Sequence, residues 1–135
     1  MRNITHTASR ALFSNGLSFG RDNTHVIRMK DPIGNHTSMQ LHGHTIAILY
    51  DHNILRISTC NHETATTKER LNGVLLHAYL NGLIPQLYLY QSNWLWYISD
   101  HKKSFLWDYF RQYSDLHGDF GAYYIDARDL LRAFN

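Results

Sequence analysis

Several features that restrict the class of a protein are scarce in this chain of 135 residues. It has one cysteine, Cys60, and two prolines. A single thiol cannot form an internal disulfide, which fits a reducing compartment better than a secreted protein. The chain also lacks a long apolar run, and Met1–His6 is polar. We therefore expect neither a signal peptide nor a membrane span.

Net charge is scarce as well. The formal charge is +2, from 13 Lys and Arg against 11 Asp and Glu, which is too little to indicate nucleic-acid binding by itself. The charge is unevenly placed. Residues 1–70 hold eight basic and five acidic residues (+3), and residues 71–135 hold five and six (−1). An anionic partner is therefore expected to prefer the first half.

The usual signatures of catalysis and metal binding are absent. There is no nucleophile elbow, Walker loop or dinucleotide glycine motif. Ten histidines are present, and His42 and His44 would share one strand face, but no cysteine or carboxylate pattern completes a zinc site. We therefore predict no metal, no cofactor and no catalytic residue.

What is present favours one globular domain over residues 1–135, because 44% of residues are hydrophobic and only 18% are charged. The pattern predicts a helix over 7–13, a strand over 23–30 and a loop over 31–35. A hairpin follows, and a turn at residues 52–53 places the alternating apolar side chains on one face: Ile46, Ile48, Tyr50, Leu55 and Ile57. The outward face then carries Leu49, Arg56 and Ser58.

A helix is predicted to begin at Thr66, with Glu69 completing a capping box, and to end near Asn81-Gly82. A second hairpin is predicted to turn at residues 92–93. One of its faces carries Leu87, Leu89, Trp96 and Ile98. The other carries Tyr88, Tyr90, Leu95 and Tyr97.

The last third is predicted to be helical, with Phe105, Tyr109 and Phe110 on one stripe and a loop at His117–Gly121. A closing helix is predicted from Asp126 to Phe134. The fold class is therefore α+β. We expect a small antiparallel sheet of about four or five strands, made of two hairpins and a further strand, with the central helix and C-terminal helices packed on it.

Five short motifs resemble a family of small accessory proteins encoded by tailed bacteriophages. They are Asn23–Val26, Leu41–Ala47, Thr59-Cys60, Thr66–Gly73 and Trp96-Tyr97. The family typically reads Asn-Thr-x-Val, Leu-His-Gly-Asn-x-Ile-Ala, a Cys-Gly-Trp-like segment and Thr-Thr-Lys-x-Arg-Leu-Asn. The resemblance covers roughly residues 8–98, and the part after Asp100 is particular to this chain.

Two positions depart from that family pattern. His44 stands where the family usually has Asn, which speaks against a metal role for His42 and His44 as a pair. Asn61-His62 stand where it usually has Gly-Trp. The family has no established activity, so the resemblance implies a phage origin and a soluble domain. Together with the single thiol, it leads us to expect the protein in the host cytoplasm.

The helix start is the best candidate for binding an anion. A helix N-terminus offers free N–H groups and the positive end of the dipole, and hydroxyl and basic side chains add to both. The predicted phosphate-binding or nucleic-acid-binding residues are Thr66, Thr67, Lys68, Arg70, Asn72 and His42. The alternative is structural: Thr66 caps the helix, Lys68 is solvated and Arg70 pairs with an acid.

The second hairpin carries a separate prediction, because both of its faces are apolar. Tyr88, Tyr90 and Tyr97 are predicted to form an interface with a partner or with a second copy. Stacking on bases and burial beneath the C-terminal helices are the alternatives.

These observations favour a phage accessory protein that binds a phosphate-containing partner, either nucleic acid or a nucleotide. The alternative is a protein–protein interaction module that inhibits a host or defence protein or belongs to the virion. An enzyme with His42 as acid or base beside Lys68 and Arg70 is the third interpretation.

Overall fold

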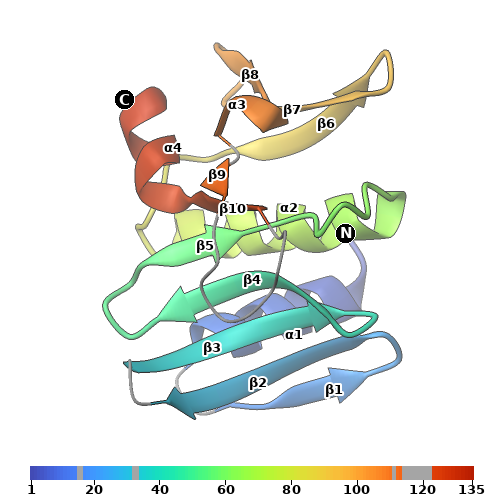
Figure 1. Ribbon diagram of the computed structural model, residues 1–135, viewed down its shortest axis with the longest axis vertical. Coiled ribbons are helices and arrows are strands. Elements are labelled where there is room, and N and C mark those ends of the chain that lie inside the picture. Colours follow the sequence, from blue (N-terminus) through green and yellow to red (C-terminus); the bar gives the residue numbers. More distant parts are fainter. Residues whose placement is uncertain (15–16, 32–33, 111, 114–122) are drawn as a thin grey trace.

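The computed structural model describes residues 1–14, 17–31, 34–110, 112–113 and 123–135. Within them, ten strands and four helices form two antiparallel sheets with helices packed against them, which confirms the α+β class. The larger sheet has the order β1-β2-β3-β4-β5-β10-β9 (Figure 1). Its strands are β1 (Phe19–Arg21), β2 (Thr24–Asp31), β3 (Gly34–Leu41), β4 (His44–Tyr50), β5 (Leu55–Ile57), β9 (Gln112–Tyr113) and β10 (Tyr123–Asp126).

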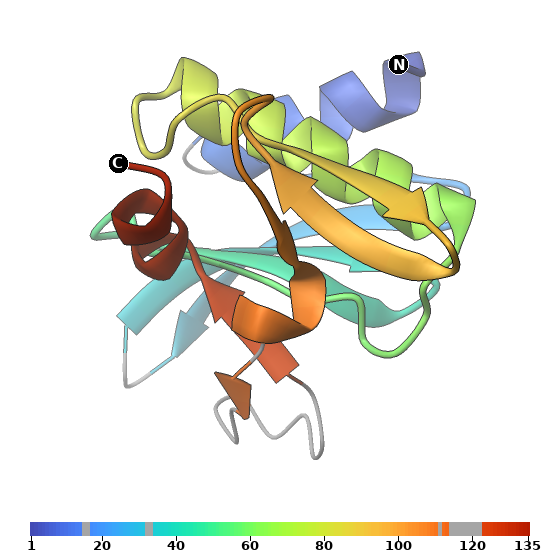
Figure 2. The ribbon, with the colours of Figure 1, turned by 90° about the horizontal axis from the view of Figure 1, so that it is seen from above.

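Two long helices, α1 (Asn3–Phe13) and α2 (Ala65–Leu80), lie side by side on one face of this sheet (Figures 1 and 2). They can approach closely because α2 carries a glycine where they meet. A Cβ on Gly73 would lie 2.3 Å from Thr5 Cγ2 and 2.8 Å from Ser9 Oγ. The glycine thus fixes the distance between the two helices.

The second sheet has the order β6-β7-β8. Its strands are β6 (Tyr88–Ser92), β7 (Leu95–Ser99) and β8 (Ser104–Leu106), and the short helices α3 (Trp107–Phe110) and α4 (Ala127–Ala133) follow in the chain. One face of this sheet, with Leu89, Trp96 and Ile98, is buried in the core. Strand β6 also contacts α2, so α2 is shared by the two sheets.

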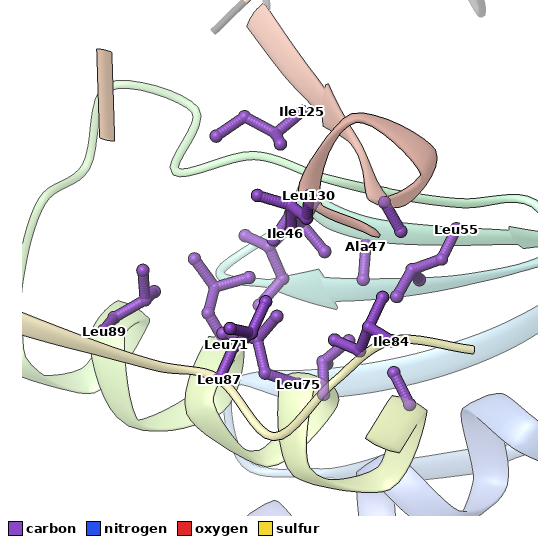
Figure 3. Close-up of a cluster of buried hydrophobic side chains, with 14 of the residues drawn as sticks. Ile46, Ala47, Leu55, Leu71, Leu75, Ile84, Leu87, Leu89, Ile125 and Leu130 are labelled. Carbon is purple, nitrogen blue, oxygen red and sulfur yellow. The ribbon is translucent and has the colours of Figure 1, made fainter. Parts of the chain in front are cut away.

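One continuous core joins these parts. Figure 3 shows Ile46 and Ala47 of β4 near Leu71 and Leu75 of α2, with Leu130 of α4 above them. All five side chains are at most 1% exposed. Burial of this apolar surface is the main force that holds both sheets and the C-terminal helix on α2.

The sheet prediction is correct in class and wrong in layout. The two predicted hairpins lie in different sheets, and the larger sheet contains more strands than expected. The sequence pattern does not predict strand β3, and it predicts a loop at the first residues of this strand, Gly34 and Asn35. It is hard to detect because His36, Thr37 and Ser38 are consecutive, polar and buried, so the strand shows no alternation of apolar and polar residues.

The predicted register of the first hairpin is wrong by one residue. Leu49 pairs with Leu55 and Ala47 with Ile57, so Leu49 packs against the core rather than facing outward. The pairing of β3 with β4 shifts at Ile46, and both Ile46 and Ala47 lie in the core. Such a bulge re-aims neighbouring side chains, which simple alternation does not anticipate.

In the second hairpin the predicted faces are confirmed and the predicted turn is not. Tyr90 pairs with Tyr97 and Leu89 with Ile98, which shifts the pairing by two residues and leaves each side chain on its predicted face. The turn residues are Asn93 and Trp94, both with positive φ (50° and 68°), as a type I′ turn requires. A Trp is unusual there, since glycine is favoured.

The last third contains less helix than predicted. Phe105 lies in β8, and Tyr109 and Phe110 belong to the single turn of α3. The closing helix is confirmed, with Asp126 as its N-cap. The loop predicted at His117–Gly121 lies outside the described residues. No helix among the described residues is long and apolar enough to cross a membrane.

Candidate anion-binding pocket

A pocket of about 350 Å³ lies where the β3–β4 turn meets the first turn of α2. Three parts of the chain build it: the end of β3 with the start of β4, the segment between β5 and α2, and the N-terminus of α2. The lining residues are Leu41, His42, His44, Ile46, Thr59, His62, Thr64, Thr66 and Thr67.

The two loops of the pocket are held in defined conformations. His42 and Gly43 form the β3–β4 turn with φ values of 52° and 81°, and the His42 N–H donates to Asn23 O at 2.8 Å. On the other side, Cys60 and Asn61 also have positive φ (50° and 61°). The chain there reverses sharply and places His62 over the pocket.

Hydrogen bonds fix the β5–α2 segment internally. The Cys60 thiol donates to Thr45 O at 2.9 Å, and the Cys60 N–H donates to Ser58 Oγ at 3.0 Å. The His62 N–H then donates to Thr59 O at 2.9 Å. This segment therefore presents His62 from a fixed backbone, and the cysteine has a structural role.

The N-terminus of α2 opens into the pocket, and its cap is Thr64 rather than the predicted Thr66. The Thr67 N–H donates to Thr64 Oγ1 at 3.2 Å, and the Lys68 N–H donates to Thr64 O at 3.0 Å. The N–H groups of Ala65 and Thr66 precede the first possible intrahelical bond. They remain available to an anion at the positive end of the helix dipole.

Three exposed histidines surround this helix end. The His44 and His62 rings lie 4.4 Å apart between centroids, at an angle of 37°. His42 Nε2 lies 3.3 Å from Asn23 Nδ2. Among the described residues that line the pocket, histidine is the only type with an ionisable side chain. The N-terminus of α2 therefore supplies the positive end of a helix dipole here, and the imidazole rings add nitrogens that can form hydrogen bonds.

Thr59 is the most buried polar residue facing this space apart from Thr67. Thr59 is 2% exposed and lines the pocket, and its hydroxyl has no hydrogen-bond partner among the described residues. This hydroxyl is not among the buried side-chain atoms that lack a partner, so it is accessible from the pocket. A ligand that accepts its hydrogen bond would replace water there.

The structure brings together only part of the predicted site. His42, Thr66 and Thr67 line the pocket, whereas Lys68, Arg70 and Asn72 do not. His44, His62, Thr59 and Thr64 were missed, although all four lie within or between the quoted motifs. The signal in the sequence was the co-occurrence of three histidines and four threonines in segments that a hairpin and a helix cap bring to one end.

Arg70 lies inside the protein instead of on its surface. It is 1% exposed. Its Nη1 donates to Thr5 Oγ1 at 2.7 Å and to Glu69 Oε1 at 3.1 Å, and its Nε donates to Thr24 Oγ1 at 3.1 Å. This arrangement matches the structural alternative given above, in which Arg70 pairs with an acid.

The acid beside Arg70 is stabilised as a carboxylate. Burial favours the neutral form of Glu69, but the hydrogen bond from Thr5 and the charge of Arg70 outweigh it and hold the pKa of Glu69 below its usual range. The Thr5 hydroxyl donates to Glu69 Oε1 at 2.6 Å. Arg70 and Glu69 thus form a satisfied ion pair between α1, α2 and β2.

The predicted tyrosine interface lies on the outer face of the small sheet. Tyr90 and Tyr97 stack at 5.2 Å between ring centroids with 12° between planes, and Tyr88 contacts both Tyr90 (5.8 Å) and His101 (4.6 Å). All three tyrosines are half-buried by each other and by their neighbours. No described helix covers this face (Figure 2).

No group of three or more His, Cys, Asp or Glu side chains able to hold a metal ion occurs among the described residues.

A family model described as "Kyanoviridae Gp96 protein" matches residues 1–116 of the chain. No curated protein and no solved structure matches this chain.

Proposed function

The chain belongs to the Kyanoviridae Gp96 family of phage proteins, and from that premise we propose that it is an accessory protein whose pocket binds a phosphate-containing anion, either a nucleotide or nucleic acid. One observation carries the proposal: the N-terminus of α2, with two N–H groups left unbonded, opens into a concave site whose described lining has three histidines and no carboxylate. Helix N-termini bind phosphate through N–H groups and the dipole.

The size of the pocket also supports this proposal. Small-molecule sites typically measure about 300–1,000 Å³, and this one, at about 350 Å³, suits one nucleotide unit. It cannot hold a duplex. Leu41 and Ile46 supply an apolar wall against which a sugar or base can pack.

Titration calorimetry with AMP, inorganic phosphate and a single-stranded oligonucleotide tests the proposal at low and moderate salt. We expect binding that weakens with salt. Replacing His44 and His62 together by Ala should weaken it about tenfold or more, because charge-assisted hydrogen bonds are lost.

His52→Ala is the matched control for these variants. His52 is an exposed histidine in the β4–β5 turn, and it does not line the pocket. This variant should bind as the parent does. Absence of binding to all three probes by the parent protein would contradict the proposal.

A second candidate function is an interaction module that uses the tyrosine face. The pairing of β6, β7 and β8 places Tyr88, Tyr90, Leu95, Tyr97 and Leu106 on this face. The three strands carry no charged side chain on it. Leu95 and Leu106 are 49% and 43% exposed, so the face is apolar at its edges.

An uncharged face can pair with itself about a two-fold axis without like-charge repulsion. We therefore favour a second copy of this chain as the occupant. Light scattering over a concentration series tests this: Tyr90→Lys should abolish a dimer, whereas Tyr79→Lys, at a 40% exposed tyrosine of α2, should not. A monomer at all concentrations would contradict self-association and leave a different protein as the partner.

A further inference from the structure

We infer that the pocket selects a terminal phosphate, a phosphomonoester such as that of a nucleoside monophosphate or of a phosphorylated strand end, over the phosphodiester inside a strand. This inference rests on the proposed function, since it specifies the ligand of the same site. Three features of the pocket point to it: the depth of one hydroxyl, the set of donors and the contact between two histidines.

Depth is the first feature. Thr59 belongs to the buried wall of the pocket and its hydroxyl has no partner among the described residues. A ligand must enter the pocket to reach it. A terminal phosphate can enter end-on, because all of its substituent lies behind it. A phosphodiester carries chain on two sides and can only lie across the mouth.

The donor set is the second feature. The N–H groups of Ala65 and Thr66 approach from the helix end, the Thr59 hydroxyl from the β5–α2 segment, and the imidazoles from two loops. Donors thus come from several directions. A phosphomonoester offers three unesterified oxygens, each a strong acceptor. A phosphodiester offers two, so part of this set would stay unused.

The third feature is the contact of His44 with His62. Their ring centroids are 4.4 Å apart and both line the pocket, so both rings can contact one bound anion. A phosphomonoester, with about −1.5 to −2 charges at neutral pH, is a stronger hydrogen-bond acceptor for them than a singly charged diester. The charged residues that flank this segment, Glu63 and Lys68, do not line the pocket.

The decisive experiment compares one short single-stranded oligonucleotide with a 5′-phosphate and with a 5′-hydroxyl, with AMP as a third probe. Fluorescence anisotropy and calorimetry give the dissociation constants. We expect the 5′-phosphorylated strand to bind about tenfold or more tightly than its 5′-hydroxyl form, as expected for hydrogen bonds to a charged group. AMP should compete with it for the same site.

Variants of Thr59 connect this preference to the pocket. Thr59→Val keeps the shape and removes the hydroxyl, so it should reduce the preference for the 5′-phosphate and leave the 5′-hydroxyl strand unaffected. Thr59→Ser should retain the preference. Thr45→Val, on β4 and outside the pocket lining, is the matched control, and circular dichroism checks that each variant is folded.

The outcomes separate this inference from the proposed function. Equal affinity for the two strands, with both lost in the His44 and His62 double variant, would overturn the inference and keep the pocket as a general phosphate site. Binding of neither strand and of no AMP would overturn both. A preference that persists unchanged in Thr59→Val would also overturn the inference, because the ligand would not reach the buried wall.

Discussion

Asn72 makes both of its side-chain hydrogen bonds to the backbone of one residue, Leu89. The Leu89 N–H donates to Asn72 Oδ1 at 2.6 Å, and Asn72 Nδ2 donates to Leu89 O at 3.1 Å. Leu89 is in β6, at the edge of the small sheet. An edge strand has unpaired backbone groups, and here one amide side chain from α2 satisfies a donor and an acceptor at once.

Asn72→Asp should therefore loosen the small sheet from α2. The carboxylate can still accept from the Leu89 N–H, but it has no donor for Leu89 O and places a charge against it. We expect a loss of about 1–3 kcal/mol in the free energy of unfolding. Hydrogen exchange should show faster exchange at Leu89 and its neighbours in β6. Unchanged exchange there would contradict the role of Asn72 as the anchor.

Arg70 is expected to be essential for stability. Replacing it by Met keeps an unbranched apolar stem but removes the guanidinium, so Glu69 loses its opposite charge and Thr5 and Thr24 lose one hydrogen bond each. Breaking a buried ion pair on one side typically costs about 3–5 kcal/mol. The Glu69 side chain is 28% exposed, so we expect the lower part of that range, measured by chemical denaturation. Lys68→Ala, two residues earlier in α2 and part-exposed, should change stability by less than about 0.5 kcal/mol.

The Arg70 variant should also disturb the pocket indirectly. Arg70 Nε donates to Thr24 Oγ1, and the Thr24 hydroxyl donates to Asn23 Oδ1 at 3.0 Å. Asn23 in turn contacts His42 at the pocket rim. Thr24→Val interrupts this chain at one point. If Thr24→Val lowers stability while the NMR signals of His42 stay unchanged, the surroundings of Arg70 and the pocket rim are independent.

Much of the fold could be predicted from the sequence, because short-range sequence patterns determine it. The Asn81-Gly82 helix end, the Asp126 cap and the faces of the second hairpin follow from turn chemistry and alternation. The strand order of the larger sheet could not be predicted, because β10 pairs with β5 across a long stretch of chain. The bulge at Ile46 is equally a property of the assembled sheet.

The candidate site could be predicted only in part, for a related reason. The motif from Thr66 to Gly73 combines residues with different tasks: Thr66 lines the pocket, Arg70 pairs inside the protein, Asn72 holds β6 and Gly73 allows α1 to approach. A sequence motif does not show which of its members face solvent. His62 joins His44 only because two loops with positive φ meet.

Gly73→Ala should destabilise the protein although alanine favours helices. In an exposed helix the change would stabilise by up to about 1 kcal/mol. Here the new methyl group meets Thr5 Cγ2 at 2.3 Å and Ser9 Oγ at 2.8 Å, and such overpacking typically costs about 1–3 kcal/mol. Thermal unfolding measures the net loss.

A compensating change tests the cause of that loss. Thr5→Ser removes the methyl group that clashes and keeps the hydroxyl that bonds to Glu69 and Arg70. The double variant with Gly73→Ala should recover part of the lost stability. A gain in stability from Gly73→Ala alone would show that the two helices can separate at no cost.

Stability should decline on mild acidification because of His77. This histidine of α2 is 8% exposed, and its Nε2 lies 3.3 Å from His6 Nδ1 of α1. Burial lowers the pKa of His77 below its ordinary value, and the neighbouring His6 and Arg10 lower it further. Between that ordinary value of about 6.5 and the lower folded value, the unfolded chain binds a proton that the folded chain does not. Stability therefore falls as the pH drops below about 6.5.

Titration of the carboxylates with lowered pKa values does not change stability in the pH range of the His77 effect. The pKa values of Glu69 and Asp126 are lowered in the folded protein, so their contribution is lost only as the pH falls below about 4. Melting temperatures measured between about pH 7.5 and 4.5 isolate the histidine effect. His77→Gln keeps a polar partner for His6 without a titrating group, so its melting temperature should vary less over this range. His52→Gln, at an exposed turn, should keep the pH dependence of the parent's melting temperature. If both variants reduced this pH dependence equally, the acid sensitivity would not originate at the contact between α1 and α2.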